Sequence, residues 1–402
     1  MNHHVPHTIE PVPPRPRVAV AYHFFPHYRA SIIGALSASA RYAYVFVGSR
    51  VPCMADEQSI KACSFAPGTA FVEAPCRAFF NSILWQPGLL RLALDPSMDA
   101  IIYLANVRWP CTWISALLAR LTGKRVLFWT HGWIRSESAA RIALRNSFYR
   151  ISHSLLLYGN RAKAIALSHG FREANLHVIY NSLNYPLQKQ LRATIDDECR
   201  RAIRSRLFAD PDRPLAICSA RLVKGKSLDL LMTAAALLSR RGLPVNILIV
   251  GSGPELSALS ALAESMSLAV QFVGECYDEA LLAQYFVAAD FCVSPGNVGL
   301  TAIHSLGYGV PVVTHDNAEL QMPESEALSE GRTGWLYHHD DVADLARAMA
   351  ACMDALRGDG RSRVRTLCYE VCELHYTAEV QMRNIERALD ATLARVSADE
   401  PG

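Results

Sequence analysis

The feature that most constrains the fold is a repeated order of segments: a short apolar stretch, a loop with glycine or basic residues, and an amphipathic stretch. In the first half, apolar stretches at 17–22 and 42–48 flank a helical pattern at 31–40. In the second half, residues 215–219 are apolar, and leucines recur with helical spacing over 226–240. This alternation is typical of parallel, doubly wound α/β sheets. The sequence therefore predicts an α/β fold with ligands at the carboxyl ends of the strands.

The chain has 402 residues, which predicts two domains because one hydrophobic core rarely serves so long a chain. The alternation is interrupted by a polar, charged stretch that we interpret as a linker. The expected order is a Pro-rich flexible tail at 1–16, a first α/β domain at 17–185, the linker at 186–213, a second α/β domain at 214–370, and a C-terminal helix at 371–402 that packs back towards the first domain.

Composition excludes several classes of protein. Half of the residues are apolar, which is too many for a disordered chain, and no stretch of 18 to 20 residues is apolar enough to cross a bilayer. The N-terminus lacks the apolar centre of a signal peptide. The eleven cysteines form no C-x-x-C pair and no clustered set with histidine, so we expect reduced thiols, a cytoplasmic protein and no metal site.

Charge is distributed unevenly along the chain. Residues 1–185 contain 19 Lys and Arg against 8 Asp and Glu, a net +11, whereas the remainder carries −8. A basic first half suggests contact with anions, either lipid headgroups or a phosphate-bearing acceptor, although an unevenly charged solvated surface would look the same. The stretch 79–94 is apolar and aromatic, and it fits either a membrane surface or a pair of core helices. No nucleic-acid motif is present, so nucleic acid is not an expected partner.

Two cations follow the strand at 215–219. Arg221 and Lys226 lie in and just after the loop that opens the next helix, where backbone N–H groups and the helix dipole also favour negative charge. Two further helices begin after strands, at Pro254 and at Gly299, and Gly296 would let a ligand approach the backbone closely. The sequence therefore predicts a diphosphate site, although exposed basic residues in a surface loop would give the same local pattern.

Polar residues in the first half also follow strands. His27, Tyr28 and Arg29 come after the strand at 17–22 and are candidates for gripping a substrate, with an aromatic loop packed on the sheet as the alternative. His131 ends another strand and is followed by glycine, which places its side chain where it can contact a polar ligand at the same edge of the sheet.

A set of motifs in the second half resembles the retaining sugar-nucleotide glycosyltransferases of family 4, of the bacterial surface-polysaccharide type. The motifs are A-R-L-V-K-G-K-S-L-D-L-L, V-G-S-G-P-E, F-V-G-E, A-A-D-F-C-V-S-P-G, V-G-L-T-A-I-H-S-L-G-Y-G-V-P-V-V and E-G-R-T-G-W-L, in family order from about 215 to 350. The first half is similar more loosely, through P-H-Y-R, T-H-G and V-I-Y-N-S. The resemblance implies the GT-B fold, in which two Rossmann-like, doubly wound parallel-sheet domains face a cleft, the first binding the acceptor and the second the nucleotide sugar.

The resemblance also implies roles for individual residues. Arg221 and Lys226 would hold the donor diphosphate, and His131 would lie near the acceptor and the reacting sugar carbon, so these three are the candidate catalytic residues. The remaining candidates bind a substrate: Gly274 and Glu275 the nucleobase, Gly299, Leu300 and Thr301 the distal phosphate, and His27, Tyr28 and Arg29 the acceptor.

The sequence departs from the family at one pair of positions. Many members have two glutamates eight residues apart here, one for sugar hydroxyls and one for the ribose, whereas this chain has Gly296 and His304. Histidine can still hydrogen-bond a ribose hydroxyl, while glycine offers no side chain to a sugar. Asn297 or backbone amides are the expected replacement, with Glu319, Glu324 and Glu326 as further sources of a carboxylate.

The expected activity is transfer of a sugar from a nucleotide-diphosphate sugar to an acceptor hydroxyl of a lipid-linked or polysaccharide precursor, with retention of configuration. The pairs Asp196-Asp197 and Asp340-Asp341 are adjacent residues in helical, solvent-facing contexts and do not form a metal motif, so the reaction is expected to need no metal and no cofactor. The expected location is cytoplasmic, with peripheral contact to the inner face of the membrane. Two alternatives remain open: a GT-B sugar-nucleotide epimerase, and a non-catalytic GT-B protein that binds sugar nucleotides.

Overall fold

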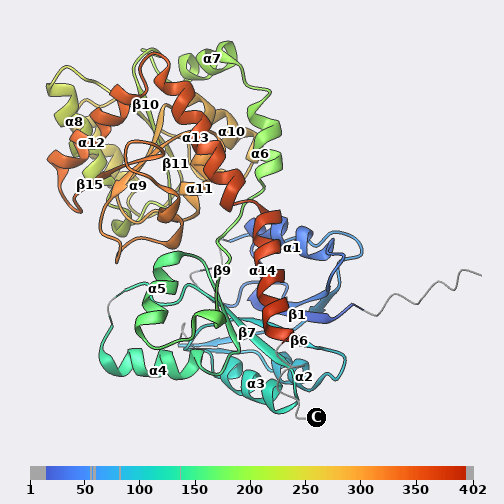
Figure 1. Cartoon of the computed structure of the whole chain (residues 1–402). Coiled ribbons are helices and arrows are strands. Elements are labelled where there is room, and N and C mark those ends of the chain that lie inside the picture. Colours follow the sequence, from blue (N-terminus) through green and yellow to red (C-terminus); the bar gives the residue numbers. More distant parts are fainter. Residues whose placement is uncertain (1–14, 55–56, 58–59, 81–82, 136, 395–402) are drawn as a thin grey trace, which may run out of the picture.

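The structure is a computed structural model, and it describes residues 15–54, 57, 60–80, 83–135 and 137–394. Two α/β domains follow one another along the chain, joined by a connecting segment and by a long C-terminal helix (Figure 1). Each domain has a parallel sheet covered by helices, so the predicted fold class is confirmed.

The first sheet has the strand order β3-β2-β1-β6-β7-β8-β9 among the described residues, and every neighbouring pair is parallel. Strand β1, in the interior of this sheet, is buried from its second residue to its end, because alternating valine and alanine pack against helices on both faces. Its strands are β1 (Arg17–Phe24), β2 (Ala43–Ser49), β3 (Phe71–Glu73), β6 (Ala100–Leu104), β7 (Arg125–Thr130), β8 (Ser154–Leu157) and β9 (Leu176–Val178). The helices are α1 (Ala30–Ser37), α2 (Gly88–Leu94), α3 (Pro110–Leu121), α4 (Ala139–Tyr149) and α5 (Asn160–Ser168).

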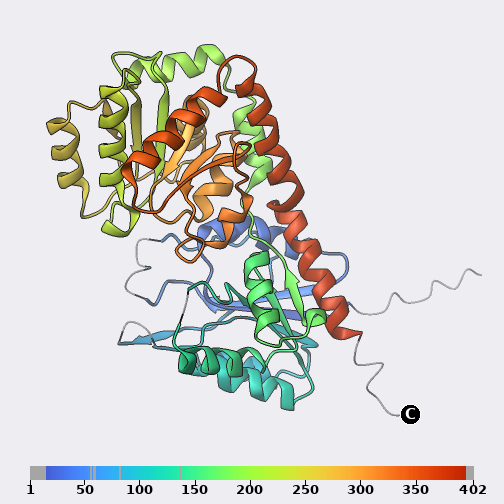
Figure 2. The same ribbon diagram turned by 60° about the vertical axis from the view of Figure 1, so that its left-hand side comes forward.

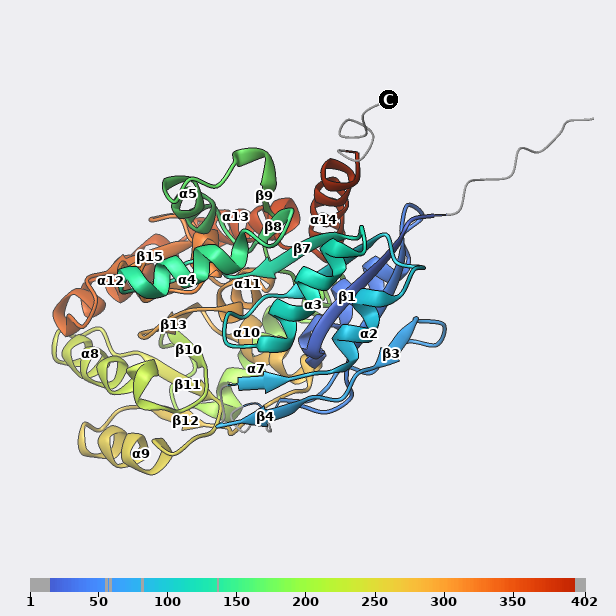
Figure 3. The same cartoon turned by 90° about the horizontal axis from the view of Figure 1, so that it is seen from below.

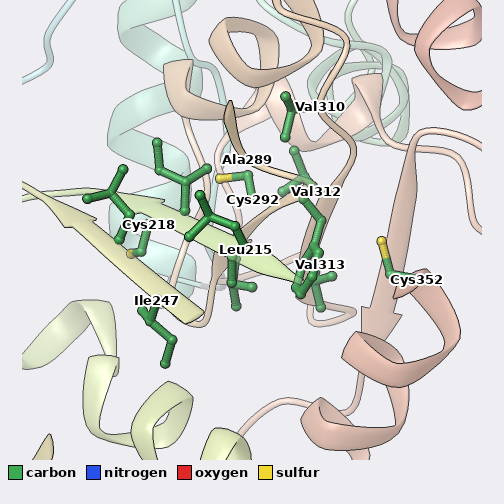
Figure 4. Packing of buried hydrophobic residues seen from close by; sticks show 14 of the residues in the cluster. Leu215, Cys218, Ile247, Ala289, Cys292, Val310, Val312, Val313 and Cys352 are labelled. Atoms are coloured by element: carbon green, nitrogen blue, oxygen red, sulfur yellow. The ribbon is translucent and has the colours of Figure 1, made fainter. Parts of the chain in front are cut away.

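The second sheet has the order β12-β11-β10-β13-β14-β15 and is also parallel throughout. Its core is formed by valine, isoleucine, leucine and cysteine side chains, of which Figure 4 shows a part around Leu215 and Cys292. The strands are β10 (Leu215–Ser219), β11 (Asn246–Val250), β12 (Val270–Phe272), β13 (Phe291–Ser294), β14 (Val312–His315) and β15 (Gly334–Tyr337). The helices are α8 (Leu228–Arg240), α9 (Leu256–Ser265), α10 (Glu279–Ala288), α11 (Leu300–Gly307), α12 (Val342–Ala355) and α13 (Gly360–His375).

The segment between the sheets contains two helices, α6 (Tyr185–Arg192) and α7 (Asp197–Leu207), which pack against α10 of the second domain. The chain then returns to the first domain through α14 (Ala378–Leu393), as Figure 2 shows. Ile385 and Leu389 of α14 are buried in the first domain's core, and Thr392 hydrogen-bonds Ser154 of β8 at 2.8 Å. The first sheet is therefore covered on this side by the last helix of the chain.

The stretch 79–94 forms neither a pair of core helices nor one amphipathic helix. A short antiparallel hairpin, β4 (Arg77–Phe79) and β5 (Ile83–Trp85), precedes α2. Pro87 stands directly before α2, where its fixed φ suits a helix start, and this limits the helix to the last part of the stretch. Across the described residues, no helix has the length and hydropathy needed to span a bilayer.

One pair of cysteines differs from the expectation of reduced thiols. Cys53 and Cys76 form a disulfide, with their Cα atoms 6.1 Å apart. They are 23 residues apart in the sequence, and the loops on either side of β3 bring them together, which no local spacing could reveal.

Candidate functional site

The loops that follow the strands of the two sheets face one another across a cleft. The loops after β10, β11 and β12 line one pocket of the second domain together with Ile60, and the loops after β7, β8 and β14 line a cavity shared by both domains. Figure 3 shows the two sheets from below. The two domains contact at one end through the rings of His27 and Tyr277, whose centroids are 5.7 Å apart. The sequence thus brings its predicted polar loops to one region.

Lys226 is held against the loop that precedes α11. It ends the short 3₁₀ helix η4 (Lys224–Lys226), and its Nζ donates to the carbonyl oxygen and to Oδ1 of Asn297, both at 2.8 Å. Partial burial lowers the pKa of Lys226. The ammonium group is therefore positioned at the N-terminal end of α11, with one of its three N–H groups unused by these two bonds.

Gly296 lies directly against the backbone of the Lys226 loop. Its N–H donates to the Lys226 carbonyl at 3.0 Å, and a Cβ at this position would lie 2.6 Å from the Gly225 oxygen and 2.8 Å from the Lys226 Cα. A glutamate cannot occupy this position without moving the loop. The departure from the family pattern is thus built into how the two loops pack.

The start of α11 is partly buried and carries no side-chain cap. Gly299 caps the helix without a side-chain hydrogen bond, so the first backbone N–H groups rely on other partners. Thr301 donates its hydroxyl to the Ser219 carbonyl at 3.2 Å and so ties the helix to the end of β10. Leu300 lies between them as the first helical residue. This arrangement of N–H groups and dipole suits an anion.

A pocket of about 510 Å³ adjoins this helix at the ends of β10 and β11. Arg221 is exposed within it, and Glu275 forms part of the opposite wall. Gly251 has a φ of +147°, and a Cβ there would overlap the Ala220 carbonyl. The backbone at Gly251 can therefore pass this close to Ala220 only because the residue is glycine. Gly274, with a φ of +76°, accepts a hydrogen bond from the Gly251 N–H at 2.7 Å and so supports the turn beneath the pocket rather than lining it.

Tyr277 is a pocket residue that the sequence reasoning missed. The Tyr277 ring lies beside the His27 ring, and the Lys61 Nζ is 5.0 Å from the centroid of the Tyr277 ring. A single exposed tyrosine near a helix start carries no local signal, because its neighbours come from another domain.

His304 is engaged with protein groups. Its Nε2 is 2.9 Å from Glu279 Oε1, which also accepts the Tyr308 hydroxyl at 2.6 Å, and its ring packs edge-on against Phe286. Burial raises the pKa of Glu279, but hydrogen bonds from His304 and Tyr308 outweigh it, and the net pKa is lowered. The structure thus places His304 between α10 and α11, and its contact with a ribose stays a prediction.

Arg29, an expected acceptor contact, is buried in the first domain. It is 7% exposed, and its guanidinium donates to Asn181 Oδ1 at 2.7 Å and to the Tyr158 hydroxyl at 2.5 Å. In this structure its guanidinium is bonded to protein groups, and its contact with an acceptor stays a prediction. His27 is exposed and Tyr28 partly exposed, so these two remain candidates for acceptor contact.

The Arg29 network continues into the second domain. Asn181 donates its side-chain N–H to Glu324 Oε1 at 2.7 Å, and Glu324 is 3% exposed. Its Oε2 has no hydrogen-bond partner among the residues the structure describes, and burial raises the pKa of this carboxyl. The same short 3₁₀ helix, η5 (Pro323–Ala327), also carries Glu326.

Glu326 caps a helix of the other domain. Its two carboxylate oxygens accept the backbone N–H groups of Asn160 at 2.7 Å and Arg161 at 2.9 Å, the first residues of α5. A Cβ at Gly159 would lie 2.8 Å from the Glu326 Cδ, so glycine is needed for this approach. An acidic group at a helix N-terminus is stabilising, and here it joins the two domains.

His131 faces a cavity shared by the domains. The cavity measures about 210 Å³ and lies between the loop after β7 and the segment 314–336. Trp133 and Arg161 line it from the first domain, and Gln321 lines it from the second. Burial, together with the nearby Arg29 charge, lowers the pKa of His131 to about 4, so its ring is neutral at pH 7.

Glu319 stands outside this group. It is exposed on the loop after β14, and its side chain lines neither the 510 Å³ pocket nor the shared cavity. Over the same described residues, no three His, Cys, Asp or Glu side chains are placed to hold a metal ion.

Comparisons with known proteins agree with this geometry. Residues 213–355 match the family model described as Glycosyl transferases group 1. A D-inositol 3-phosphate glycosyltransferase of Nocardia farcinica is 35% identical over 180 residues, which cover 42% of this chain and 38% of that protein. An alpha-monoglucosyldiacylglycerol synthase of Streptococcus pneumoniae is 28% identical over 175 residues, again 42% of this chain and 38% of that protein. The matched region thus spans less than two fifths of either relative.

Two solved structures are similar over nearly the whole chain. The crystal structure of Anabaena HepE in complex with UDP superposes with a TM-score of 0.68, covers 94% of this chain and 100% of that one, and is 13% identical in sequence. A glycosyltransferase from Rickettsia africae gives the same TM-score over 94% of this chain and 98% of its own, with 15% identity. At such identities the likeness establishes the fold.

Proposed function

Because this chain carries a Glycosyl transferases group 1 domain on a GT-B fold, we propose that it transfers a sugar from a nucleotide-diphosphate sugar to an acceptor hydroxyl. The observation that carries the proposal is the pair of bonds from Lys226 to Asn297 at the N-terminal end of α11, a helix that Thr301 ties to Ser219 in the wall of the pocket that contains Arg221. Two cations and a helix N-terminus at one position suit the diphosphate leaving group of such a reaction.

The proposed mechanism stabilises charge on the leaving group. Arg221 and the unused N–H of Lys226 donate to the diphosphate oxygens, and the N–H groups of Leu300 and Thr301 contact the distal phosphate. These donors are already in place, so little reorganisation is needed as the sugar–phosphate bond breaks. The nucleobase and ribose lie in the 510 Å³ pocket beside Glu275 and Tyr277.

In this proposal the sugar is transferred with retention, and no metal or protein nucleophile takes part. The acceptor hydroxyl attacks from the face that the diphosphate leaves and can pass its proton to a departing phosphate oxygen. Neutral His131 provides one donor and one acceptor nitrogen beside the 210 Å³ cavity, which has room for a sugar ring. The relatives named for inositol phosphate and diacylglycerol acceptors support a glycan or lipid-linked acceptor.

The test is a screen of UDP-, GDP- and ADP-sugars for thermal stabilisation, followed by transfer assays with the stabilising donor. A donor at 100 times its Kd should stabilise the fold by about 2.7 kcal/mol. The anomeric configuration of the product, measured by NMR, checks retention, and activity in EDTA checks metal independence. Appearance of an epimerised sugar nucleotide, or binding without turnover under every acceptor tried, would favour one of the two alternatives.

We also propose that the first domain lies on the inner face of the cytoplasmic membrane. Exposed apolar side chains occur on the hairpin β4–β5 and on α3, which contact one another: Phe79, Phe80, Ile83, Ile114, Leu117 and Leu121. Arg77, Arg91 and Arg120 are exposed on the same hairpin, on α2 and on α3. Apolar groups bordered by arginine suit an anionic bilayer, which would also hold a lipid-linked acceptor.

Sedimentation with vesicles tests this location. Binding should occur on vesicles with anionic lipid, weaken as salt rises, and be lost in the variant Leu117→Ser/Leu121→Ser. Leu167→Ser, on exposed α5, is the matched control, since Leu167 is 41% exposed on a different helix. Equal sedimentation of all three proteins, or none at low salt, would contradict the proposed membrane face.

A further inference from the structure

A second large cavity lies on the opposite edge of the second sheet. It measures about 410 Å³ and is lined by residues that precede strands: Pro214 before β10, Pro244 before β11 and Asp290 before β13. Because these strands are parallel, this is the amino edge of the sheet, whereas the donor pocket is at the carboxyl edge. The helix α7, which carries one wall, is on the side of the second domain away from the first domain (Figure 1).

Three arginines converge on one carboxylate at the base of this cavity. Arg200 donates to Asp290 Oδ1 at 2.5 Å, Arg204 to Oδ2 at 2.6 Å, and Arg361 also to Oδ1. The Leu215 N–H occupies Oδ2 as well, at 2.8 Å. These four bonds occupy both oxygens of the Asp290 carboxylate, and the side chain is only 5% exposed. The carboxylate therefore has no capacity left for a further cation.

This cluster has an excess of two positive charges. Burial, together with the neighbouring Arg204 and Arg361 charges, lowers the pKa of Arg200 to about 10. A partly buried excess of charge is costly unless an opposite charge reaches it. The Nε atoms of Arg200 and Arg204 also donate to the carbonyl oxygens of Val287 and Ala288 and so hold α7 against α10, but Asp290 neutralises only one of the three cations.

The rim of the cavity adds two more guanidinium groups. Arg213 and Arg357 line it, and each has one exposed acidic neighbour, Asp210 at 2.9 Å and Asp354 at 3.5 Å. Asp212 also lines the cavity and pairs with Arg201 at 3.0 Å. The side chains that line the cavity still carry a net charge of +2, from four arginines (Arg204, Arg213, Arg357 and Arg361) against Asp212 and Asp290. One wall is apolar and consists of Leu243, Met353 and Leu356, among others. Guanidinium groups match phosphate oxygens in a planar, two-point geometry.

We propose that this cavity binds a phosphate dianion, held by Arg361 from inside and by Arg213 and Arg357 at the rim. The dianion matches the cluster's excess of two charges. Both inorganic phosphate and a phosphate monoester present this group, and an ester would place its carbon chain against the apolar wall. The site is separate from the proposed donor pocket and does not depend on the proposed activity.

The experiment is calorimetric titration of inorganic phosphate at constant ionic strength, with acetate as the monoanion control. It uses the Arg221→Ala/Lys226→Ala background, so that the cleft cannot contribute a phosphate site. We expect saturable binding that the rim variant Arg213→Gln/Arg357→Gln weakens at least tenfold. Arg363→Gln is the control, because Arg363 is exposed on the same helix as Arg361 and does not line the cavity.

A repeat with glycerol 3-phosphate distinguishes the two sources of phosphate, since tighter binding of the ester indicates use of the apolar wall. The rim variant leaves the bonds to Asp290 intact, so it should fold normally. Absence of saturable phosphate binding, or binding that is the same in the rim variant and in the Arg363→Gln control, would overturn the proposal. In that case the three arginines serve only to join α7 and α13 to β13.

Discussion

The two sides of the cleft are built from different groups. On the second domain, closely packed glycines bring backbone to the ligand region, and Gly251 and Gly296 leave no room for a Cβ. On the first domain, the same region is filled by side chains that hold one another, with Arg29, Tyr158 and Asn181 in one buried network. A backbone site needs particular residues at particular spacings, whereas a side-chain network can be assembled from distant positions. Substitutions on the two sides should therefore change different quantities: turnover and donor binding in the second domain, and the free energy of unfolding in the first.

The largest expected effect is on the donor side. Arg221→Ala or Lys226→Ala should lower turnover about 100-fold or more, the typical loss for one donor to a developing negative charge. The melting temperature should change little for Arg221, which is exposed. Steady-state kinetics with the stabilising donor, beside a thermal scan, checks both. Near-normal rates in two folded variants would remove the basis for a diphosphate site on this side.

Arg29→Met should affect the fold more than the acceptor. The change leaves Asn181 and Tyr158 without their buried charged donor, which should cost about 2 kcal/mol of unfolding free energy. Denaturant unfolding measures the loss, and the KM for the acceptor should stay within a few-fold of the original value. Arg141→Met, at an exposed arginine of α4, is the control. A stable variant with a greatly raised acceptor KM would mean that Arg29 turns towards the cleft when substrate binds.

The sequence predicted more of the second domain than of the first, because a site built from backbone needs particular residues at particular spacings, whereas a side-chain network does not. The alternation of strands and helices indicated both sheets, and the glycine and lysine loops of the second domain follow directly after strands, so their position was readable. The hairpin β4–β5 was missed because the apolar stretch 79–94 has no clear period.

Contacts between distant residues were also beyond local patterns. Asn181 and Glu324 are 143 residues apart, and Glu326 caps a helix that begins 166 residues earlier. Neither carboxylate could be assigned a partner from sequence, although both were recognised as candidate acids.

Gly296→Ala tests how tightly the backbone side is packed. The added Cβ would press on the Gly225 oxygen and the Lys226 Cα, and overpacking of this kind costs about 1 to 2 kcal/mol. Because the strain falls on the lysine loop, the donor Kd should rise together with the loss of stability. Gly225→Ala is the matched control, since nothing lies within 4 Å of a Cβ there. Equal behaviour of the two variants would show that the loops are free to separate.

The smallest expected effect distinguishes two roles of His304. This residue lies in the second domain, but its ring is held by other side chains, as the buried side chains of the first domain are. Its bond to Glu279 and its contact with Phe286 predict that His304→Ala lowers the unfolding free energy by about 1 kcal/mol. If it also contacts the ribose equally in ground and transition states, the donor KM should rise while kcat stays nearly constant. His304→Gln separates these effects, because an amide can still bond Glu279 and keeps a donor and an acceptor for a ribose hydroxyl. Restored stability with an unchanged donor KM in both variants would assign His304 to packing alone, and the ribose contact would then have to come from another residue.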